Sequence, residues 1–298
     1  MIEVSILIKA INLAWASSKC EIETHPIEYG IILGSADPIK TAISGGILHG
    51  PKLDFLECTA SDVLQNYAGL QSWNKAALIV DCEKNCVDGS INLGDINVED
   101  PYEFITGVTN SIGVVAKRVS SVRIYYDGRF RVQYIFNRKR GEIEERNMES
   151  FLPLFEKREI NRNMARKIID TCFRLSEIRQ GASFIIGTPS DVRKLSITSR
   201  AGSVQKTIHD LTALEIINYA TVDGSIWVDK QGLLHEYGLK FEGPGGRLAI
   251  VKSICAKNEK ITALVVSQDG EINLVYQNET CRFASQIIPD SLFLADRL

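Results

Sequence analysis

The first half of the chain alternates short apolar runs with turn signals, a pattern that favours strands of a sheet. Residues 76–80 are continuously apolar and are followed by polar residues, so they predict a buried strand. Residues 27–33 predict a second strand. An amphipathic helix is expected at the N-terminus, with one apolar face made of Ile2, Ile6, Ala10 and Leu13.

A helix and a hairpin are predicted further along this half. Residues 100–118 favour a helix, because Asp100 suits the N-cap, Pro101 suits the first turn and Glu103 adds favourable charge there. Residues 121–138 contain two β-rich runs on either side of Asp127-Gly128, a dipeptide suited to a tight primed turn, and they predict a hairpin.

The second half alternates helical and strand patterns. Helices are predicted over residues 163–178, 202–220 and 246–257. A buried strand is predicted over residues 181–187, and hairpins are predicted to turn at residues 230–232 and 269–270. The helical spacing depends on two sets of apolar residues, Met164, Ile168, Cys172 and Leu175 in the first helix, and Val204, Ile208, Leu211 and Leu214 in the second.

A densely charged stretch over residues 138–163 separates the two halves and is interpreted as a connector. We therefore expect two domains, residues 1–155 and residues 156–298. The fold class is α/β (α+β): a C-terminal mixed sheet flanked by helices, preceded by an N-terminal α/β domain.

Composition fits a soluble globular protein with a substantial core, since 45% of the 298 residues are hydrophobic and 24% are charged. The net charge of −3 implies no bulk attraction to nucleic acid or to an anionic membrane, although it leaves a local phosphate site open. The apolar N-terminus is interrupted by Glu3 and Lys9, and it is too short and too charged to span a bilayer. Seven scattered cysteines favour reduced thiols in a cytoplasmic protein over a disulfide framework or a zinc site.

The pentapeptide VDGSI occurs twice, at residues 87–91 and 222–226. The first copy follows a predicted strand, and its Asp88-Gly89 is interpreted as a hairpin turn. The second copy follows a long helical pattern and precedes the run Gly245-Gly246-Arg247, which suits a helix start and therefore an anion site. Only the second copy has neighbours that point to a binding site.

The order of these features over about residues 160–290 resembles the diadenylate cyclase domain, the nucleotide-binding domain of DNA-integrity-scanning proteins and their relatives. The resemblance is carried by LSEIRQGASFIIG, VDGSIWVDKQGLL, the Gly-Gly-Arg run and ALVVSQDGEINLVY. It is closest to archaeal-type members that carry this domain at the C-terminus. The N-terminal half faintly resembles the sensor domains that precede such cyclase domains in bacterial proteins.

The resemblance implies a reaction and a set of parts. Two facing domains would each hold one ATP, and condensation would give cyclic di-AMP and two pyrophosphates. A divalent ion, Mg²⁺ or Mn²⁺, and donors for the triphosphate would be required, since phosphoryl transfer depends on positioning and on charge stabilisation. The implied partners are ATP or cyclic di-AMP and a second copy of the chain, at least as a face-to-face dimer.

The family's Asp-Gly-Ala motif corresponds to Asp223-Gly224-Ser225. The resemblance makes Asp223 a catalytic residue and the metal ligand, while Gly224 and Ser225 would contact the nucleotide. Read without its neighbours, Asp223-Gly224 is better explained as a turn before a strand, and only the flanking motifs favour the nucleotide site.

The family's phosphate motif, Gly-Thr-Arg-His-Arg or Gly-Ala-Arg-His, corresponds to Gly245 through Ala249. Gly245 and Gly246 would bind phosphate through the backbone, and Arg247 would be the catalytic arginine. Leu248 replaces the histidine and Ala249 replaces the second arginine, so two phosphate donors are missing. Lys252, one turn further on, is interpreted as a substitute donor or as a solvated helix lysine.

A third position that the resemblance assigns to the nucleotide site is Ser267. Many cyclases have a glutamate directly after this serine, and here the residue is Gln268, which cannot bind metal as a carboxylate does. His209 and His235 are not assigned to catalysis. Two functions therefore remain open: a diadenylate cyclase with an N-terminal regulatory domain, or a catalytically inactive sensor of a nucleotide or cyclic dinucleotide.

Overall fold

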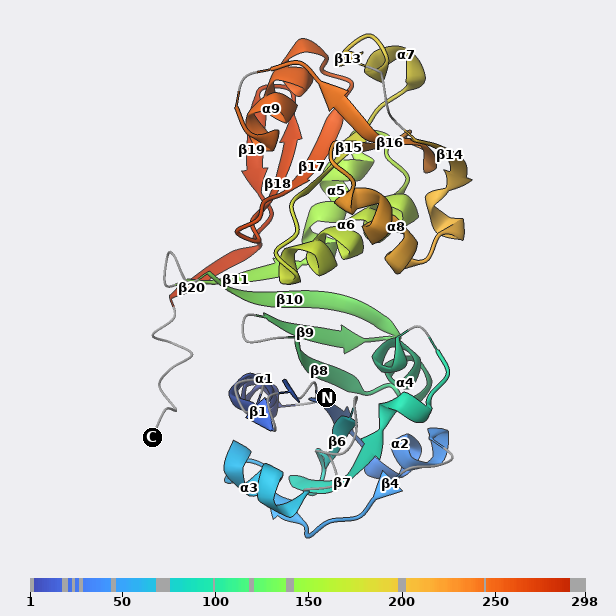
Figure 1. Cartoon of the computed structure of the whole chain (residues 1–298). Coiled ribbons are helices and arrows are strands. Elements are labelled where there is room, and N and C mark those ends of the chain that lie inside the picture. The colour runs from blue at the N-terminus through green and yellow to red at the C-terminus, as the bar shows by residue number, and fades with distance from the viewer. Residues whose placement is uncertain are drawn as a thin grey trace. The chain divides into compact units, whose positions relative to one another are not determined.

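The structure of the chain is a computed structural model (Figure 1). The described residues are 3–17, 21–22, 25–26, 29–43, 47–67, 76–98, 100–117, 121–137, 142–197, 202–243 and 245–289. They divide into two compact units, one of residues 1–146 with 286–298 and one of residues 147–285. Each unit contains a mixed sheet with helices, as expected for the α+β class. The first unit ends at residue 146, before the expected boundary near residue 155. The last strand, at residues 286–289, belongs to the first unit.

Ten strands of the first unit form one sheet, in the order β20-β11-β10-β9-β8-β3-β6-β7-β4, with β5 also paired to β7. The central pair β3–β6 is parallel, and the pairs β3–β8, β8–β9, β9–β10 and β6–β7 are antiparallel. The elements are α1 (Val4–Ser17), β1 (Glu21–Ile22), β2 (His25–Pro26), β3 (Tyr29–Gly34), α2 (Ala36–Ala42), β4 (Ile47–Leu48), β5 (Leu53–Asp54), α3 (Ala60–Asn66), β6 (Ala76–Asp81), β7 (Cys86–Asn92), α4 (Pro101–Thr109), β8 (Ile112–Lys117), β9 (Ser121–Tyr126), β10 (Arg129–Asn137), β11 (Glu142–Asn147) and β20 (Gln286–Pro289).

The apolar face predicted for the N-terminal helix packs against the sheet. Ile6, Ala10 and Leu13 of α1 are buried in one cluster with Ile31 and Leu33 of β3. Ile2 lies outside the described residues. Every residue of β6 is buried, which confirms the strand predicted at residues 76–80.

Asp88-Gly89 does not form the predicted hairpin turn. Both residues lie within β7, and the turn between β6 and β7 is made by residues 82–85 instead. Asp81 stabilises that turn, because its Oδ1 accepts hydrogen bonds from the backbone N–H groups of Glu83 and Lys84, each at 3.1 Å. Asp88 is half-buried and pairs with Lys40 of α2, so its carboxylate has a structural partner.

The helix predicted over residues 100–118 is shorter than expected. Asp100 is its N-cap and Pro101 begins α4, as predicted, but the helix ends at Thr109. Asn110 has the left-handed conformation (φ 50°), which terminates the helix. Residues 112–117 then form β8, because this run of Val and Ile side chains fits a buried strand better than a helix.

The charged stretch over residues 138–163 is not a plain connector. It contains β11 and the helix α5 (Met148–Glu156), which begins at the N-cap Asn147. Phe151, Leu152 and Phe155 of α5 are buried, and Phe151 stacks on Phe283. Three aromatic and aliphatic anchors are therefore enough to fold this segment onto the second unit despite its charge.

Eight strands of the second unit form a sheet in the order β13-β16-β15-β12-β17-β18-β19, with β14 also paired to β16. The pair β12–β15 is parallel, and β15–β16, β12–β17, β17–β18 and β18–β19 are antiparallel. The remaining elements are α6 (Arg162–Glu177), β12 (Ala182–Ile186), α7 (Pro189–Val192), β13 (Ser196–Ile197), β14 (Gly202–Thr207), α8 (Ala213–Thr221), β15 (Ser225–Val228), β16 (Leu233–Phe241), α9 (Arg247–Lys257), β17 (Thr262–Val266), β18 (Ile272–Tyr276) and β19 (Glu279–Arg282).

Most of the predicted elements of this unit are confirmed. The apolar face of α6 is fully buried, and β12 is buried throughout. α9 spans the predicted helix. The hairpins β15–β16 and β17–β18 turn where predicted, and the positive φ of Gly232 (102°) and Gly270 (87°) explains why each turn contains glycine. In the first unit, the β9–β10 hairpin turns at Asp127-Gly128, also as predicted.

The helix predicted over residues 202–220 is wrong in its first half. Residues 202–207 form β14, and α8 begins only after Thr212. Thr212 and Glu215 form a reciprocal capping box, which fixes that helix start. Leu214, expected on the apolar face, is exposed.

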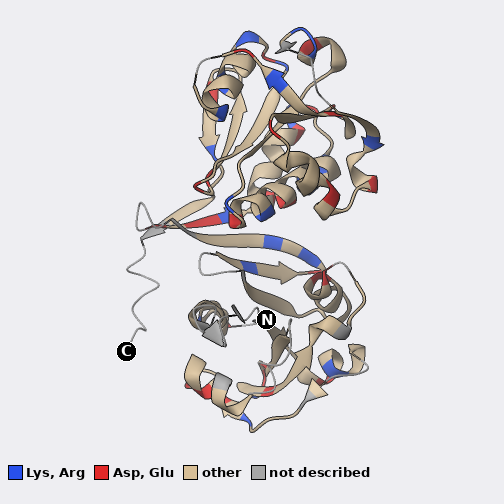
Figure 2. Cartoon of the chain, viewed as in Figure 1, with Lys and Arg blue, Asp and Glu red and all other residues tan. Residues whose placement is uncertain are grey.

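In the view of Figure 2, Lys and Arg positions are interspersed with Asp and Glu positions along both units. In the described part of the chain, no helix is long and apolar enough to cross a membrane.

Candidate functional site

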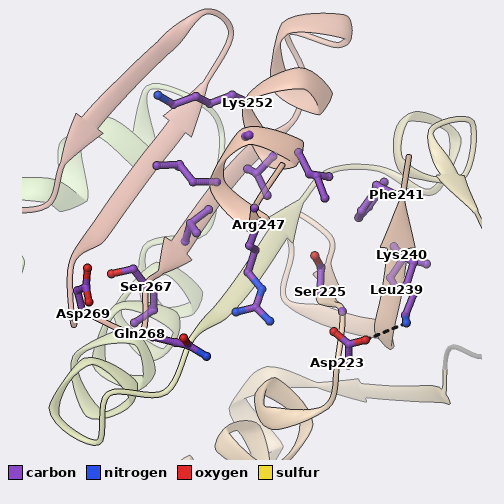
Figure 3. A pocket seen from close by; sticks show the side chains of 18 residues that line it. Asp223, Ser225, Leu239, Lys240, Phe241, Arg247, Lys252, Ser267, Gln268 and Asp269 are labelled. Atoms are coloured by element: carbon purple, nitrogen blue, oxygen red, sulfur yellow. Dashed lines mark hydrogen bonds and ion pairs between the residues drawn. The ribbon is translucent and has the colours of Figure 1, made fainter. Parts of the chain in front are cut away.

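A pocket of about 870 Å³ opens in the second unit, between the start of β15, the end of β16, the first turns of α9 and the end of β17 (Figure 3). Asp223, Gly224, Ser225, Gly246, Arg247 and Ser267 line it, so six of the sequence-predicted site residues lie around one cavity. Gly245 is the seventh and does not line it. The other lining residues are Leu239, Lys240, Phe241, Leu248, Ala249, Ile250, Val251, Lys252, Val265, Val266, Gln268 and Asp269.

Asp223 lies at the mouth of this pocket with its side chain 82% exposed. Its Oδ2 accepts a hydrogen bond from the ammonium group of Lys240, on β16, at 2.8 Å (Figure 3). This ion pair lowers the pKa of the Asp223 carboxyl, and the charge of Arg247 acts in the same direction. Asp223 is therefore a carboxylate near neutral pH, and Lys240 is a pocket cation that the sequence analysis did not single out.

Gly224 is required by the backbone. Its φ of 130° favours glycine, and a Cβ atom there would lie 2.4 Å from the carbonyl carbon of Gly238 on the neighbouring strand β16. The close crossing of the two strands at the pocket floor therefore explains this glycine without a ligand.

Ser225 is buried in the floor of the pocket and shares a hydrogen bond with Ser183 of β12, with 2.7 Å between the two Oγ atoms. Because β12 and β15 are parallel neighbours, the two hydroxyl groups lie side by side. The second serine was not predicted from the sequence.

The start of α9 presents an uncapped helix N-terminus to the pocket. Gly246 is the N-cap and has no side chain to accept hydrogen bonds from the first turn. The N-terminus of a helix carries a partial positive charge and attracts anions. Because no acidic residue lies in this first turn, that positive end is not offset locally.

Arg247 begins α9 and extends its guanidinium group into the pocket (Figure 3). A Cβ atom on Gly181, just before β12, would lie 2.6 Å from Arg247 Nη1 and 3.4 Å from Gln268 Cγ. Gly181 therefore leaves the space in which the guanidinium lies. The sequence analysis included Gly181 in a family landmark but gave it no role, since its effect depends on a residue 66 positions away.

The two residues that depart from the phosphate motif also line the pocket. Leu248 is half-buried and packs on the apolar cluster beneath α9, which includes Trp227 and Val251. Ala249 is exposed, and Lys252 follows it on the outer part of the helix. In Figure 3 the Lys252 side chain extends away from Arg247, so these two cations do not converge.

Ser267 is held by the hairpin that follows it. Its Oγ accepts a hydrogen bond from the backbone N–H of Glu271, and its own N–H donates to the Glu271 carbonyl. The side chain of Gln268 lies beside Gly181, close to Arg247. Asp269 is exposed, and its carbonyl accepts a hydrogen bond from Arg179.

The two histidines of this unit lie outside the pocket lining. His235 stacks on Trp227, with ring centroids 4.2 Å apart, and its Nε2 lies 3.1 Å from Asp229 Oδ2. It therefore supports the β15–β16 hairpin. His209 is exposed on a single helical turn before α8.

A divalent cation fits this pocket only in partnership with a ligand. Among the described residues, no three or more His, Cys, Asp or Glu side chains cluster so as to hold a metal ion. Mg²⁺ is commonly held by one or two carboxylates together with phosphate oxygens and water. Asp223 supplies one such carboxylate, and a bound triphosphate would have to supply the remaining oxygen ligands.

No protein-family model and no curated protein matches this chain. A solved structure titled as a hypothetical membrane spanning protein from Bacillus cereus is similar to 40% of this chain, at 18% identity and a TM-score of 0.34. The match spans 62% of that structure, less than two thirds of it. A double mutant of DacA from Staphylococcus aureus is similar to 45% of this chain and is covered over 94% of its own length, at 12% identity and a TM-score of 0.33.

Proposed function

We propose that residues 147–285 form a diadenylate-cyclase-like domain that binds ATP in this pocket and condenses two ATP molecules to cyclic di-AMP and two pyrophosphates. The observation that supports it is the arrangement of Arg247, Lys240 and the uncapped start of α9 around one cavity, with the Asp223 carboxylate at its mouth. Arg247 and the helix N–H groups suit a triphosphate, and the Asp223 carboxylate, with Lys240 beside it, suits the counterion of that triphosphate.

Each residue then has a defined task. Arg247 binds phosphate oxygens, and the first N–H groups of α9 bind the same anion from the backbone. Ser225 lines the pocket and adds a polar group to its floor, where its hydroxyl shares a hydrogen bond with the buried Ser183. Asp223 would hold Mg²⁺ or Mn²⁺ in place of Lys240, whose ammonium group would then face the phosphates. The ion would supply neutralisation of phosphate charge. In the condensation the bond between a 3′-oxygen and an α-phosphorus forms, the bond to the pyrophosphate group breaks, and the proton of the 3′-hydroxyl is released to water.

Condensation requires two such pockets facing each other, so the proposal includes at least a transient dimer of the second unit. The first unit would then act on the distance or orientation between paired domains. Unchanged cyclase activity after removal of the first unit would contradict that regulatory role.

A second candidate function is nucleotide or cyclic-dinucleotide binding without turnover. Leu248 and Ala249 favour it, because an apolar side chain and a methyl group stand where the family has phosphate donors. Loss of one such donor typically costs a hundredfold or more in rate, about 3 kcal/mol of transition-state stabilisation. Binding depends less on these donors than turnover does, since Arg247 and the helix start remain.

One experiment separates the two. Purified chain is incubated with ATP and Mn²⁺ or Mg²⁺, the products are analysed by mass, and binding of a non-hydrolysable ATP analogue is measured by calorimetry. Cyclic di-AMP that disappears in Asp223→Asn supports the cyclase. Glu259→Gln is the control, since Glu259 is exposed and lies outside the pocket lining. Binding without product supports the sensor, and absence of both overturns the proposed function.

A further inference from the structure

The two units repeat one order of elements. In the second unit the sheet runs β16-β15-β12-β17-β18-β19, and in the first it runs β7-β6-β3-β8-β9-β10. The central pair is parallel in both, and the neighbours on either side are antiparallel. Two further strands pair with the outer strand in each case, β4 and β5 on β7, and β13 and β14 on β16. The helices α3 and α8 precede the second central strand, and α4 and α9 precede the third.

The register of the strands allows a residue-by-residue correspondence. Tyr126 and Tyr276 each end a strand at a two-residue turn, before β10 and β19 respectively. The paired residues can be followed from Tyr126 across β8 to β3, and from Tyr276 across β17 to β12. Ile32 of β3 then corresponds to Ile185 of β12. Gly34 is the last residue of β3 and Gly187 directly follows β12, and the next residues, Ser35 and Thr188, are the N-caps of α2 and α7.

The far end of the sheet tests this correspondence independently. The same correspondence, continued from β3 to its parallel neighbour β6 and from β12 to its parallel neighbour β15, matches Asp81 with Asp229. Asp81 is the last residue of β6 and Asp229 directly follows β15, and the Oδ1 atom of each accepts hydrogen bonds from backbone N–H groups of the next turn. The two units therefore share an aspartate that stabilises a turn through backbone N–H groups, at a position that was not used to align them. This agreement indicates that the two units have the same fold.

The pocket floor differs between the copies. In the second unit Ser225 lines the pocket and shares a hydrogen bond with Ser183 behind it. The residues of the first unit that correspond to Ser183 and Ser225 are Gly30 and Ala77. The smaller pair makes room for Tyr102. A Cβ atom on Gly30 would lie 2.4 Å from the Tyr102 hydroxyl oxygen, so the tyrosine ring lies directly over this floor.

Tyr102 closes the space that is open in the second unit. It lies in the first turn of α4, the helix equivalent to α9, and is 5% exposed. Its hydroxyl donates to the carbonyl of Ala76 at 3.3 Å, and its ring stacks on Tyr125. Ala76 corresponds to Gly224.

The helix start is closed as well. Asp100 caps α4, since its Oδ1 accepts hydrogen bonds from the N–H groups of Tyr102 and Glu103 and its Oδ2 accepts one from Tyr125. The equivalent N-cap of α9 is Gly246, which has no side chain. A carboxylate bound to the helix N-terminus satisfies the groups that would bind phosphate and repels a second anion.

We propose that the first unit is a second copy of the fold of residues 147–285 in which Tyr102 and Asp100 close the equivalent pocket, so that each chain carries one nucleotide site. The number of nucleotide sites, one per chain (the one-site count), rests on the proposed function. The closure of the first unit's equivalent pocket by Tyr102 and Asp100 (the closed copy) does not. It follows that the second ATP needed for condensation is held by residues 147–285 of another copy of this chain, and not by the first unit of the same chain.

A labelling experiment tests the closed copy without any nucleotide. Ser225→Cys and Ala77→Cys place thiols at corresponding floor positions, and both are treated with a small anionic methanethiosulfonate and mapped by peptide mass. We expect Ser225→Cys to react and Ala77→Cys to react at least about tenfold more slowly, because labelling there requires local opening. Adding Tyr102→Ala to Ala77→Cys should restore fast labelling. Equal rates in the two single variants overturn the closed copy, even if Tyr102→Ala fails to fold.

Stoichiometry tests the one-site count. Titration of the full chain with a non-hydrolysable ATP analogue should give one molecule per chain, and Arg247→Ala should weaken that site. Two molecules per chain, or a site of unchanged affinity in Arg247→Ala, overturns the count. Absence of all binding contradicts the proposed function and with it the count, while the labelling rates decide the closed copy separately.

Discussion

Asp223 and Lys240 form an ion pair across the mouth of the pocket, with Lys240 Nζ 2.8 Å from Asp223 Oδ2. Both side chains are largely exposed, at 82% and 62%. Exposed pairs of this kind contribute about 0–1 kcal/mol to stability, so the carboxylate can exchange its partner at little cost. The pair therefore keeps Asp223 ionised without committing it to the lysine.

Replacing Lys240 by glutamine should raise the pKa of the Asp223 carboxyl toward its ordinary value, because Lys240 is the main cause of the lowered pKa. The titration is followed through the Asp223 carboxyl carbon by NMR. Stability from this pair is present at neutral pH and is lost as the pH falls through the lowered pKa. Lys252→Gln is the matched control, since Lys252 lines the same pocket and does not lower this pKa. An unchanged Asp223 titration in Lys240→Gln would contradict the ion pair.

Gly181→Ala should weaken nucleotide binding by displacing Arg247. The added Cβ would lie 2.6 Å from Arg247 Nη1, so the guanidinium must move away from the pocket floor. We expect a loss of about tenfold or more in affinity, the usual contribution of a hydrogen bond to a charged group. Calorimetry on both single variants and on the double variant with Arg247→Ala checks the cause. If Gly181→Ala still weakens binding by the same factor when Arg247 is absent, the glycine acts in another way.

Local signals in the sequence predicted most of the hairpins and buried strands. The dipeptide Asp127-Gly128 is enough to predict the β9–β10 hairpin, because a primed turn needs positive φ at both of its central positions and few other dipeptides provide it. The candidate site residues from Asp223 to Ser267 were predicted as an ordered set, and six of the seven line one pocket. Lys240 and Ser183 were missed, because their roles depend on strand neighbours that only the pairing of β12, β15 and β16 defines.

Helix limits were the weakest part of the sequence analysis. The helical spacing of Val204, Ile208 and Leu211 was misleading, since Val204 lies on a strand and the other two residues are buried around a single turn. Thr212 and Glu215 carried the correct signal, a capping box. The repeated fold was hidden for a different reason: its two copies share strand register and turn geometry, with few identical residues. The two VDGSI segments fall at non-equivalent places, one within β7 and one entering β15.

Cysteine reactivity should differ sharply within the second unit. Burial raises the pKa of the Cys255 thiol to about 12, and the side chain lies fully buried on the inner face of α9. Cys281 on β19 is half-buried. Iodoacetamide should therefore modify Cys281 in the native protein and leave Cys255 intact from about pH 7 to about pH 9, because the thiolate is the reactive form. Peptide mass mapping reads the result, and modification of both at equal rates would contradict the burial of Cys255.

Gly224→Ala should destabilise the second unit by about 2 kcal/mol or more. The new Cβ would meet the backbone of Gly238 at 2.4 Å, and the φ of 130° is strained for alanine. Gly246→Ala is the matched control, since nothing lies within 4 Å of its added Cβ and an N-cap change of this kind costs under about 1 kcal/mol. Urea unfolding measures both. Equal stability of the two variants would show that β15 and β16 can separate at this crossing.

Leu248→His tests how far the missing phosphate donor limits the reaction. Residue 248 lies in the first turn of α9 and lines the pocket directly after Arg247, so an imidazole there can reach an anion that Arg247 binds. If the domain is a weakened cyclase, the substitution should raise cyclic di-AMP formation by about tenfold or more, the inverse of losing such a donor. Leu248 also packs on the apolar cluster beneath α9, so thermal unfolding must be measured alongside. Leu248→Gln is the control, since it is similarly polar at this position but cannot carry a positive charge. Formation of product by Leu248→His alone would locate the defect in this one side chain. If both variants fold and bind ATP yet form no product, the departure at Leu248 is not what limits turnover, and the sensor function gains support.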